Sequence, residues 1–380
     1  NVFSLLNMCL ISGKIGKELC GINPPRGQNN VQGATDVGAS PVNYPGYIPV
    51  KNDENRRKVA NIWNVEYESL SAKNGLTTVE IMQAAYEGKI KGLYVFGENP
   101  MITDPNLNHT EQAIKKLDFL VVQDIFFTQT CELADVVLPA SSLFEKDGTV
   151  VNSDRRVLKI NKVVDCPGEA REDWKIILDI AKAMNVNIGK YSKPEEIFEE
   201  LRKVAPIFAG INYERIKFQG IQWPCPDEQH PGTSTLFLEK FNTESGKAKL
   251  FPVEFYPQSE KTSSEYPFIL NSGRLLYHYH SSTMTDKVDV LKSFSPSGFV
   301  LVNSIDAEKF KLQDKMRVKI SSKQGSLETI VKITDEVLEG ELFMPWHFGD
   351  MQVNRLTRDE LDPMSKIAAF KLTAVKIEKI

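Results

Sequence analysis

The sequence lacks the features that mark nucleic-acid-binding and membrane proteins. Its 380 residues carry 46 basic and 50 acidic side chains, so the net charge of −4 gives no electrostatic footprint for nucleic acid. No apolar run approaches the roughly 18 residues that a membrane helix needs. The apolar segment 1–10 lacks the basic leader and the small-residue cleavage site of a signal peptide. We therefore expect a cytoplasmic protein without a membrane span, and leave open an export signal on any preceding segment.

Cysteine is scarce and scattered. The five cysteines are not spaced two or three residues apart, so the sequence contains no zinc or iron–sulfur ligand cluster. We expect reduced thiols and no metal ligand within this chain. The P-loop, the Gly-x-Ser-x-Gly elbow, the His-Glu-x-x-His motif and a Gly-x-Gly-x-x-Gly turn after a strand are also absent.

What the sequence does contain begins with a long segment rich in Gly, Pro and Asn at residues 20–50. Loops of this length inside compact domains are usually functional or disordered. Its two tyrosines favour an ordered loop. Within it, Arg26 stands beside Gln28 and further amide side chains, and an arginine fork matches a carboxylate bidentately. A polar surface turn is the simpler alternative.

Residues 91–139 have the pattern of α/β units. Three short apolar strands are predicted at 91–96, 119–124 and 135–139, with a helix between the first two. Unalternating strands separated by helices favour a parallel sheet that is covered on both faces. Further helices are predicted at 173–184 and 194–204, because each carries one apolar stripe.

From residue 266 the pattern changes to short alternating strands separated by turns. They are predicted at 268–272, 299–303, 316–322, 326–334, 341–345 and 370–378. This favours a second domain that is mostly β, plausibly a barrel.

Two polar motifs suggest ligand contacts. Gly97-Glu98-Asn99-Pro100 follows the first strand and Gln123-Asp124 ends the second, so both could line one crevice at the carboxyl edge of the sheet. Ordinary turn residues are the alternative there. The segment 273–285 holds two histidines followed by hydroxyl side chains, which suits a phosphate-bearing heteroaromatic ligand better than a metal. An ordinary hydrophilic loop is the alternative for this segment.

Taken in order, several segments resemble the molybdopterin oxidoreductase superfamily, and most closely the catalytic (alpha) subunit of formate dehydrogenases. They are PPRGQNNVQGATDVGASPVNYPGY, GENPMITDPNL, VVQDIFFTQTCELADVVLPAS, EKDGTVVNSDRRV, GEAREDWKII, SGRLLYHYHSSTMT and FKLTAVKIE. The resemblance extends from about residue 20 to residue 378. The RGQNN and HYHSSTMT loops point to formate dehydrogenases more narrowly than the other segments do.

The resemblance implies an α/β plus β fold with three parts. Residues 1–50 would end a preceding α/β domain, residues 51–262 would form a Rossmann-like three-layer domain, and residues 263–380 would form a C-terminal β-barrel of the double-psi type. It also implies molybdenum or tungsten held by two molybdopterin guanine dinucleotides, and reversible two-electron oxidation of formate to CO2.

The resemblance further implies roles for individual residues. Arg26 matches the arginine that holds the formate carboxylate beside the metal, and Gln28 matches its polar neighbour. The residues that match cofactor-binding positions are Gly97, Glu98, Asn99, Thr103, Gln123, Asp124, Asp173, Arg274, Tyr277, His278, Ser281, Asn354 and Lys371. Two departures stand out: Asn99 replaces an Asp of some relatives, and Phe370 replaces a Tyr.

The family's [4Fe–4S] cysteines and its selenocysteine or cysteine metal ligand have no counterpart here. We therefore expect a C-terminal portion that is inactive alone and that works with an amino-terminal segment or chain. Iron–sulfur or other electron-transfer subunits would be further partners. The alternatives are another molybdopterin oxidoreductase, such as a nitrate reductase, and a non-catalytic cofactor-binding or scaffold subunit.

Overall fold

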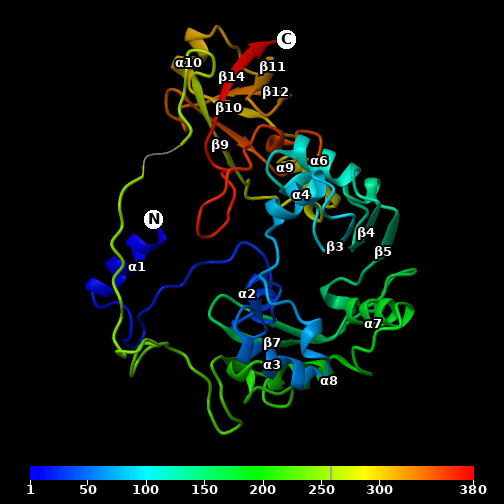
Figure 1. Ribbon diagram of the computed structural model, residues 1–380. Helices are drawn as coiled ribbons and strands as arrows, with labels where there is room; N and C mark the ends of the chain where they lie inside the picture. Colours follow the sequence, from blue (N-terminus) through cyan, green and yellow to red (C-terminus); the bar gives the residue numbers. More distant parts are fainter. Residues whose placement is uncertain (257–258) are drawn as a thin grey trace. The chain divides into compact units, whose positions relative to one another are not determined.

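The computed structural model describes residues 1–256 and 259–380 (Figure 1). The chain forms two compact units, each built from two separate stretches of sequence. Unit 1 comprises Asn1–Gly75 and Ser141–Pro257, and unit 2 comprises Leu76–Ala140 and Gln258–Ile380. The domain boundaries expected at residues 50 and 262 remain predictions.

Unit 2 contains the predicted parallel sheet. Strands β3 (Gly92–Phe96), β4 (Phe119–Asp124) and β5 (Val136–Pro139) pair in parallel in that order. Helices α4 (Thr78–Tyr86) and α6 (Leu107–Lys115) pack with them, and α5 (Pro100–Thr103) is a single turn. The buried core holds Val95, Leu120 and Val122 from the strands with Met82 and Ile114 from the helices, so α4 and α6 bury apolar side chains against the sheet. The strand side chains Tyr94, Phe96 and Phe119 are 41%, 53% and 50% exposed, so the predicted covering of both faces is not found within the described residues of this unit.

A closed six-stranded barrel makes up the rest of unit 2, which confirms the predicted β-barrel. Its strands are hydrogen-bonded in the order β10-β12-β11-β14-β9-β13. Their bounds are β9 (Phe268–Gly273), β10 (Val300–Val302), β11 (Arg317–Ser321), β12 (Ser326–Ile333), β13 (Glu341–Pro345) and β14 (Thr373–Lys379). Short helices α9 (Asp289–Phe294) and α10 (Ser304–Lys309) lie between strands. Alternate strand residues such as Val318 and Ile320 point inward and are fully buried, as the alternating sequence predicted.

Polar contacts join α6 to the barrel within unit 2. The Arg355 guanidinium donates to Asn108 Oδ1 at 2.6 Å and reaches the Glu111 carboxylate at 3.1 Å. Asn108 Nδ2 donates to the carbonyl of Gln324 at 2.9 Å. These side-chain contacts therefore join the two stretches of sequence that form unit 2.

Unit 1 is built on an antiparallel sheet that the sequence analysis did not predict. It consists of β6 (Gly148–Val151), β7 (Arg156–Ile160) and β8 (Ile221–Gln222). Two-stranded β1 (Asn43–Tyr44) and β2 (Ile48–Pro49) form a separate ribbon. The helices of this unit are α1 (Val2–Ile11), α2 (Val31–Asp36), α3 (Asp53–Trp63), α7 (Asp173–Ala183) and α8 (Pro194–Val204), and the last two confirm the predicted helices.

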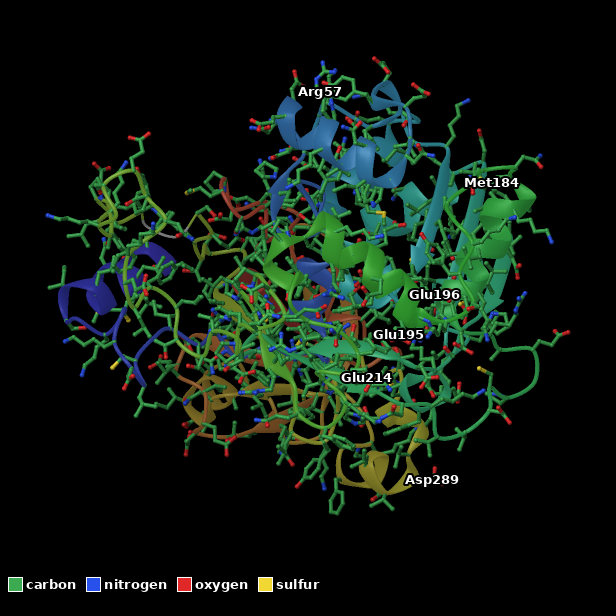
Figure 2. All side chains as sticks on the ribbon, turned by 90° about the horizontal axis from the view of Figure 1, so that it is seen from below. Arg57, Met184, Glu195, Glu196, Glu214 and Asp289 are labelled. Carbon is green, nitrogen blue, oxygen red and sulfur yellow. The ribbon has the colours of Figure 1, made fainter. Side chains whose placement is uncertain are left out.

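The core of unit 1 lies between the antiparallel sheet and α8. It includes Val151 and Val157 from the sheet, Phe198 from α8 and Phe208 beyond it. The acidic side chains Glu195 and Glu196 occupy the first turn of α8, where they interact favourably with the helix N-terminus (Figure 2). Within residues 1–256 and 259–380, no helix is long and apolar enough to cross a membrane.

Candidate functional site

Arg26 lies in an irregular stretch of unit 1 between α1 and α2. The loop is attached to β6 because Asn30 Oδ1 accepts a hydrogen bond from the backbone N–H of Val151 at 2.9 Å. Gly33 packs so closely there that a Cβ would lie 2.0 Å from that same oxygen, which explains the glycine. Arg26 is exposed, and its Nη2 donates to Gln32 Oε1 at 3.1 Å. Gln28 is half-buried two residues further on.

Behind Arg26 lies a buried carboxylate that the sequence analysis missed. Asp36 is fully buried at the end of α2. Its Oδ1 accepts hydrogen bonds from Gln32 Nε2 at 2.7 Å and from the Tyr47 hydroxyl at 2.6 Å, and its Oδ2 accepts one from Trp223 Nε1 at 2.7 Å. Burial raises the pKa of Asp36, and the three donors with the charge of Arg26 act in the opposite direction.

The two strand-end motifs of unit 2 lie next to each other. Phe96 is the register partner of Gln123, and the N–H of Gly97 donates to the Gln123 carbonyl at 2.8 Å. Asp124 Oδ1 accepts from the backbone N–H groups of Ile125 and Phe126 at 2.7 and 3.3 Å. This confirms the expected proximity of the two motifs at the carboxyl edge of the sheet.

Asn99 is buried, and both ends of its side-chain amide are hydrogen-bonded within unit 2. Its Nδ2 donates to Gln129 Oε1 at 2.9 Å, and its Oδ1 accepts from the Thr130 hydroxyl at 2.7 Å. A ligand that bound Asn99 would have to exchange these partners. Glu98 accepts a hydrogen bond from the hydroxyl of Thr103 at 3.2 Å.

Asp104 is a second buried acid that the sequence analysis did not single out. It is 4% exposed, and its Oδ2 has no hydrogen-bond partner within residues 1–256 and 259–380. Burial, with a smaller contribution from the Glu98 carboxylate, raises the pKa of Asp104 to about 7. The residue sits beside Thr103, which was predicted to bind the cofactor.

Four of the predicted cofactor residues line one cavity of about 210 Å³ in unit 2. They are Thr103, Arg274, Asn354 and Lys371, and the other lining residues are Ser272, His280, Trp346 and Phe370. Lys371 Nζ donates to the carbonyl of Ser272 at 2.7 Å. No carboxylate lines this cavity, so its two cations face each other without a counter-charge from the lining residues.

The electrostatics of that cavity follow from its two cations. Burial lowers the pKa of Lys371, and the positive charge of Arg274 lowers it further. The same two causes lower the pKa of His280 to about 4, so its imidazole is neutral at pH 7. Asn354 Nδ2 donates to the carbonyls of Ile102 and Thr103 at 2.9 and 3.2 Å, while its buried Oδ1 has no partner in the described chain.

The residues predicted to bind the cofactor in the loop after β9 differ in their burial. His278 is buried, its Nε2–H donates to the Ser295 carbonyl at 2.8 Å, and its Nδ1 lies 3.1 Å from the Thr285 hydroxyl. Tyr277 stacks on Phe294 with ring centroids 4.8 Å apart. Ser281 lines a second cavity of unit 2, of about 300 Å³, together with Gln129, Lys287 and Lys292.

Asp173 is the first residue of α7 in unit 1, where it forms an ion pair with Lys146. It belongs to a different unit from Gln123 and Asp124. Within residues 1–256 and 259–380, no three His, Cys, Asp or Glu side chains come together as a metal site would require.

The residues of the 210 Å³ cavity fit a molybdopterin dinucleotide. Arg274 and Lys371 supply positive charge for phosphate oxygens, and the unpartnered Asn354 Oδ1 can accept a hydrogen bond from a ring N–H or amino group. Neutral His280, which lies edge-on to Trp346 with centroids 5.0 Å apart, adds a donor or acceptor next to an aromatic surface. A buried polar atom without a partner costs free energy unless a ligand or water satisfies it.

Comparison with known proteins also points to a molybdopterin dinucleotide. Residues 1–183 match the molybdopterin oxidoreductase family, and residues 268–374 match the molybdopterin dinucleotide binding domain family. The F420-dependent formate dehydrogenase subunit alpha of Methanocaldococcus jannaschii is 45% identical over 380 residues, which is 100% of this chain and 56% of that protein. Formate dehydrogenase H of Escherichia coli is 37% identical over 100% of this chain and 53% of its own length.

One further relative and one solved structure widen the comparison. The assimilatory nitrate reductase catalytic subunit of Bacillus subtilis is 37% identical and is covered over 54% of its length, with 99% of this chain aligned. Acetylene hydratase from Pelobacter acetylenicus superposes with a TM-score of 0.67 at 17% identity, covering 87% of this chain and 50% of that structure, which shows a shared fold. The chain thus spans just over half the length of these relatives. The two family matches, with the relatives that align over the whole chain, place it in the molybdopterin oxidoreductase family.

Proposed function

We propose that this chain is part of a formate dehydrogenase that interconverts formate and CO2, releasing two electrons and one proton in the oxidative direction. The proposal is based on the exposure and the hydrogen bonding of the Arg26 side chain. Its guanidinium is exposed and makes one side-chain hydrogen bond within residues 1–256 and 259–380, so most of its donors are left for a ligand. A planar guanidinium matches a planar carboxylate through two parallel hydrogen bonds.

The role of Arg26 in this proposal is to bind and orient formate. A fixed guanidinium would hold both formate oxygens and so direct the C–H bond toward the redox centre. Gln28 would supply a neutral amide in the same pocket. The support from relatives is that both formate dehydrogenase subunits named above align over the entire chain.

We further propose that the cofactor is a pair of molybdopterin guanine dinucleotides with molybdenum or tungsten. Arg274, Asn354 and Lys371 would hold phosphate and pterin groups, and the strand-end residues Gln123 and Asp124 would contact a guanosine. The bound metal centre supplies the two-electron redox chemistry. The proposed roles of Gly97, Glu98, Asn99, Thr103, Asp173, Tyr277, His278 and Ser281 stay predictions of the same kind.

The proposal includes partners for this chain. The relatives that align with it are nearly twice as long, so we propose that the [4Fe–4S] cluster and the protein ligand to the metal are supplied by a segment outside the aligned portion. Iron–sulfur or other electron-transfer subunits would then remove the electrons. This chain would contribute the substrate arginine and part of the cofactor pocket.

Nitrate reduction is the second candidate, because a nitrate reductase subunit is 37% identical over nearly the whole chain. Nitrate is also a planar anion that an arginine fork can bind. A third possibility is a cofactor-binding scaffold that does not turn over substrate. The first two candidates differ in the anion that is consumed, and the scaffold would consume neither anion.

The test is a substrate comparison on the full-length protein with its natural partners. Metal content, guanine nucleotide released per metal, formate-dependent dye reduction and nitrate-dependent dye oxidation would be measured on one preparation. Formate turnover with about two guanine nucleotides per metal supports the proposal. Nitrate turnover alone would replace it with the second candidate, and cofactor without turnover of either anion would favour the scaffold. A folded protein without cofactor would contradict the cofactor assignment as well.

A further inference from the structure

The buried Asp36 is connected to Arg26 through a single side chain. Gln32 is 7% exposed, accepts a hydrogen bond from Arg26 through Oε1, and donates one to Asp36 through Nε2. Its Nε2 also lies within 2.9 Å of the Tyr47 hydroxyl. Gln32 and Asp36 are four residues apart on α2, so the helix itself brings their side chains together.

The direction of the Gln32 amide is determined by its partner. An ionised carboxylate has no proton to donate, so only the NH2 end of Gln32 can face Asp36. The carbonyl end must then face the guanidinium, which has donors and no acceptor. If the amide were reversed, two donors would meet at Arg26 and two acceptors at Asp36.

Asp36 is itself held from two other directions. The Tyr47 hydroxyl, next to the β1–β2 ribbon, binds Oδ1, and the indole of Trp223, just after β8, binds Oδ2. These donors come from parts of unit 1 that are far apart in sequence. The carboxylate therefore stays in place when one neighbour moves, and its hydrogen bonds are charge-assisted and strong.

We infer that Asp36 is a positioning residue that acts through Gln32 to hold the Arg26 guanidinium in one orientation for an anionic substrate. This inference rests on the proposed function of Arg26 and goes beyond it, because it assigns the control of substrate binding to a carboxylate that does not touch the substrate. The relay fixes one edge of the guanidinium and leaves its other donors free for a carboxylate.

The direct test is Asp36→Asn in the full-length protein with its partners. Asparagine has nearly the same shape but can donate, so it no longer forces the Gln32 amide into one direction and the bond to Arg26 is no longer enforced. The expected result is a rise of at least tenfold in the KM for formate with kcat changed less than threefold, at unchanged metal and guanine-nucleotide content. Gln32→Met, which keeps the volume and leaves Asp36 bonded to Tyr47 and Trp223, should give the same split even if Asp36→Asn folds poorly.

A double variant that conserves the charge distinguishes loss of the Arg26 orientation from a general loss of protein stability. In the double variant Gln32→Glu with Asp36→Asn, the new carboxylate can accept from Arg26 on one oxygen and from the new amide on the other. The KM should return to within about threefold of wild type. Thr35→Ala is the matched control on the same helix, since it removes only the 3.1 Å bond from Thr35 Oγ1 to the Val31 carbonyl and should leave KM unchanged.

Each outcome is decisive. A wild-type KM in Asp36→Asn and Gln32→Met, or a double variant that is no better than Asp36→Asn, would overturn the relay. If the wild-type protein holds cofactor but ignores formate, the proposed function fails separately. Crystal structures then decide the relay: Asp36→Asn should lose the 3.1 Å bond between Arg26 Nη2 and Gln32 Oε1, and retention of that bond would contradict it.

Discussion

The Asp36 cluster of unit 1 and the 210 Å³ cavity of unit 2 both gather polar side chains, but they satisfy them differently. In the cluster, both oxygens of Asp36 are hydrogen-bonded, by Gln32, Tyr47 and Trp223. In the cavity, Asn354 Oδ1 has no partner within the described residues, and Arg274 and Lys371 have no carboxylate in the lining. A completed network holds a side chain in place, whereas an incomplete one is suited to receive a ligand.

The energetic reason for the difference is the cost of unpaired buried groups. A buried donor or acceptor without a partner costs about 1–3 kcal/mol, and a buried charge costs more. The cluster avoids this cost by itself, whereas Asn354 in the cavity and Asp104 each keep one buried oxygen without a partner in the described residues. Variants that supply or remove hydrogen bonds in the cluster, in the cavity and at Asp104 therefore test this difference in energetic cost.

The largest effect is expected at Asp104, whose burial opposes its charge. Its pKa of about 7 in the folded state lies above the ordinary value of 3.8, so the folded state binds the proton more tightly than the unfolded chain does. The contribution of Asp104 to stability is thus least unfavourable below about pH 4 and becomes more unfavourable as the pH rises toward 7. Asp104→Asn should raise the free energy of unfolding at pH 8, with a ceiling of about 4 kcal/mol from the pKa difference.

The measurement for Asp104 is chemical denaturation of both proteins, without cofactor, at pH 8 and near pH 4. The advantage of Asp104→Asn should shrink toward zero at the acidic end. An advantage that is the same at both pH values would contradict the pKa argument, because it would reflect packing and not ionisation.

A smaller effect is expected when the completed network is interrupted. Trp223→Phe keeps one aromatic ring but removes the indole N–H that donates to Asp36 Oδ2, so loss of this bond should lower the free energy of unfolding by about 1–3 kcal/mol. Trp174→Phe is the matched control, because it removes the 2.8 Å bond from Trp174 Nε1 to the partly exposed Glu172. Equal losses in the two variants would show that Asp36 does not need its full set of donors.

The smallest effect concerns the two cations of the cavity. Arg274→Ala combined with Lys371→Ala should weaken binding of pyrophosphate to the cofactor-free protein about tenfold, measured by calorimetry at low salt. The control is Arg317→Ala with Lys319→Ala, which removes the same charge from exposed positions on β11. Equal weakening in the control would assign the binding to net charge and not to the cavity.

Much of the fold could be predicted from the sequence because it depends on local patterns. The strands at 92–96 and 119–124 are short apolar runs followed or ended by polar residues, and the barrel strands alternate, so their type follows from the side-chain pattern. Their pairing order in the barrel was not predicted. The short helix Val31–Asp36 was not predicted, since it contains a glycine and lies within a loop-like segment. Without that helix, the pairing of Gln32 with Asp36 could not be expected.

The site was predicted in part for a similar reason. Thr103, Arg274, Asn354 and Lys371 were singled out through the family resemblance, and the structure brings them into one cavity. Asp36 and Asp104 were missed because their importance lies in burial by distant segments. Trp223, for example, is 187 residues from the Asp36 carboxylate that it binds, and no local pattern carries that information.

The most direct test of the account is the kcat/KM for formate of wild type, Arg26→Ala and Arg26→Lys at equal metal and guanine-nucleotide content. Loss of the guanidinium should lower kcat/KM by about a thousandfold, the effect of removing a group that binds and orients the reacting anion. Lysine should recover little, since it keeps the charge but not the planar fork. Formate turnover within about threefold of wild type in Arg26→Ala would contradict the assignment of Arg26 to the substrate.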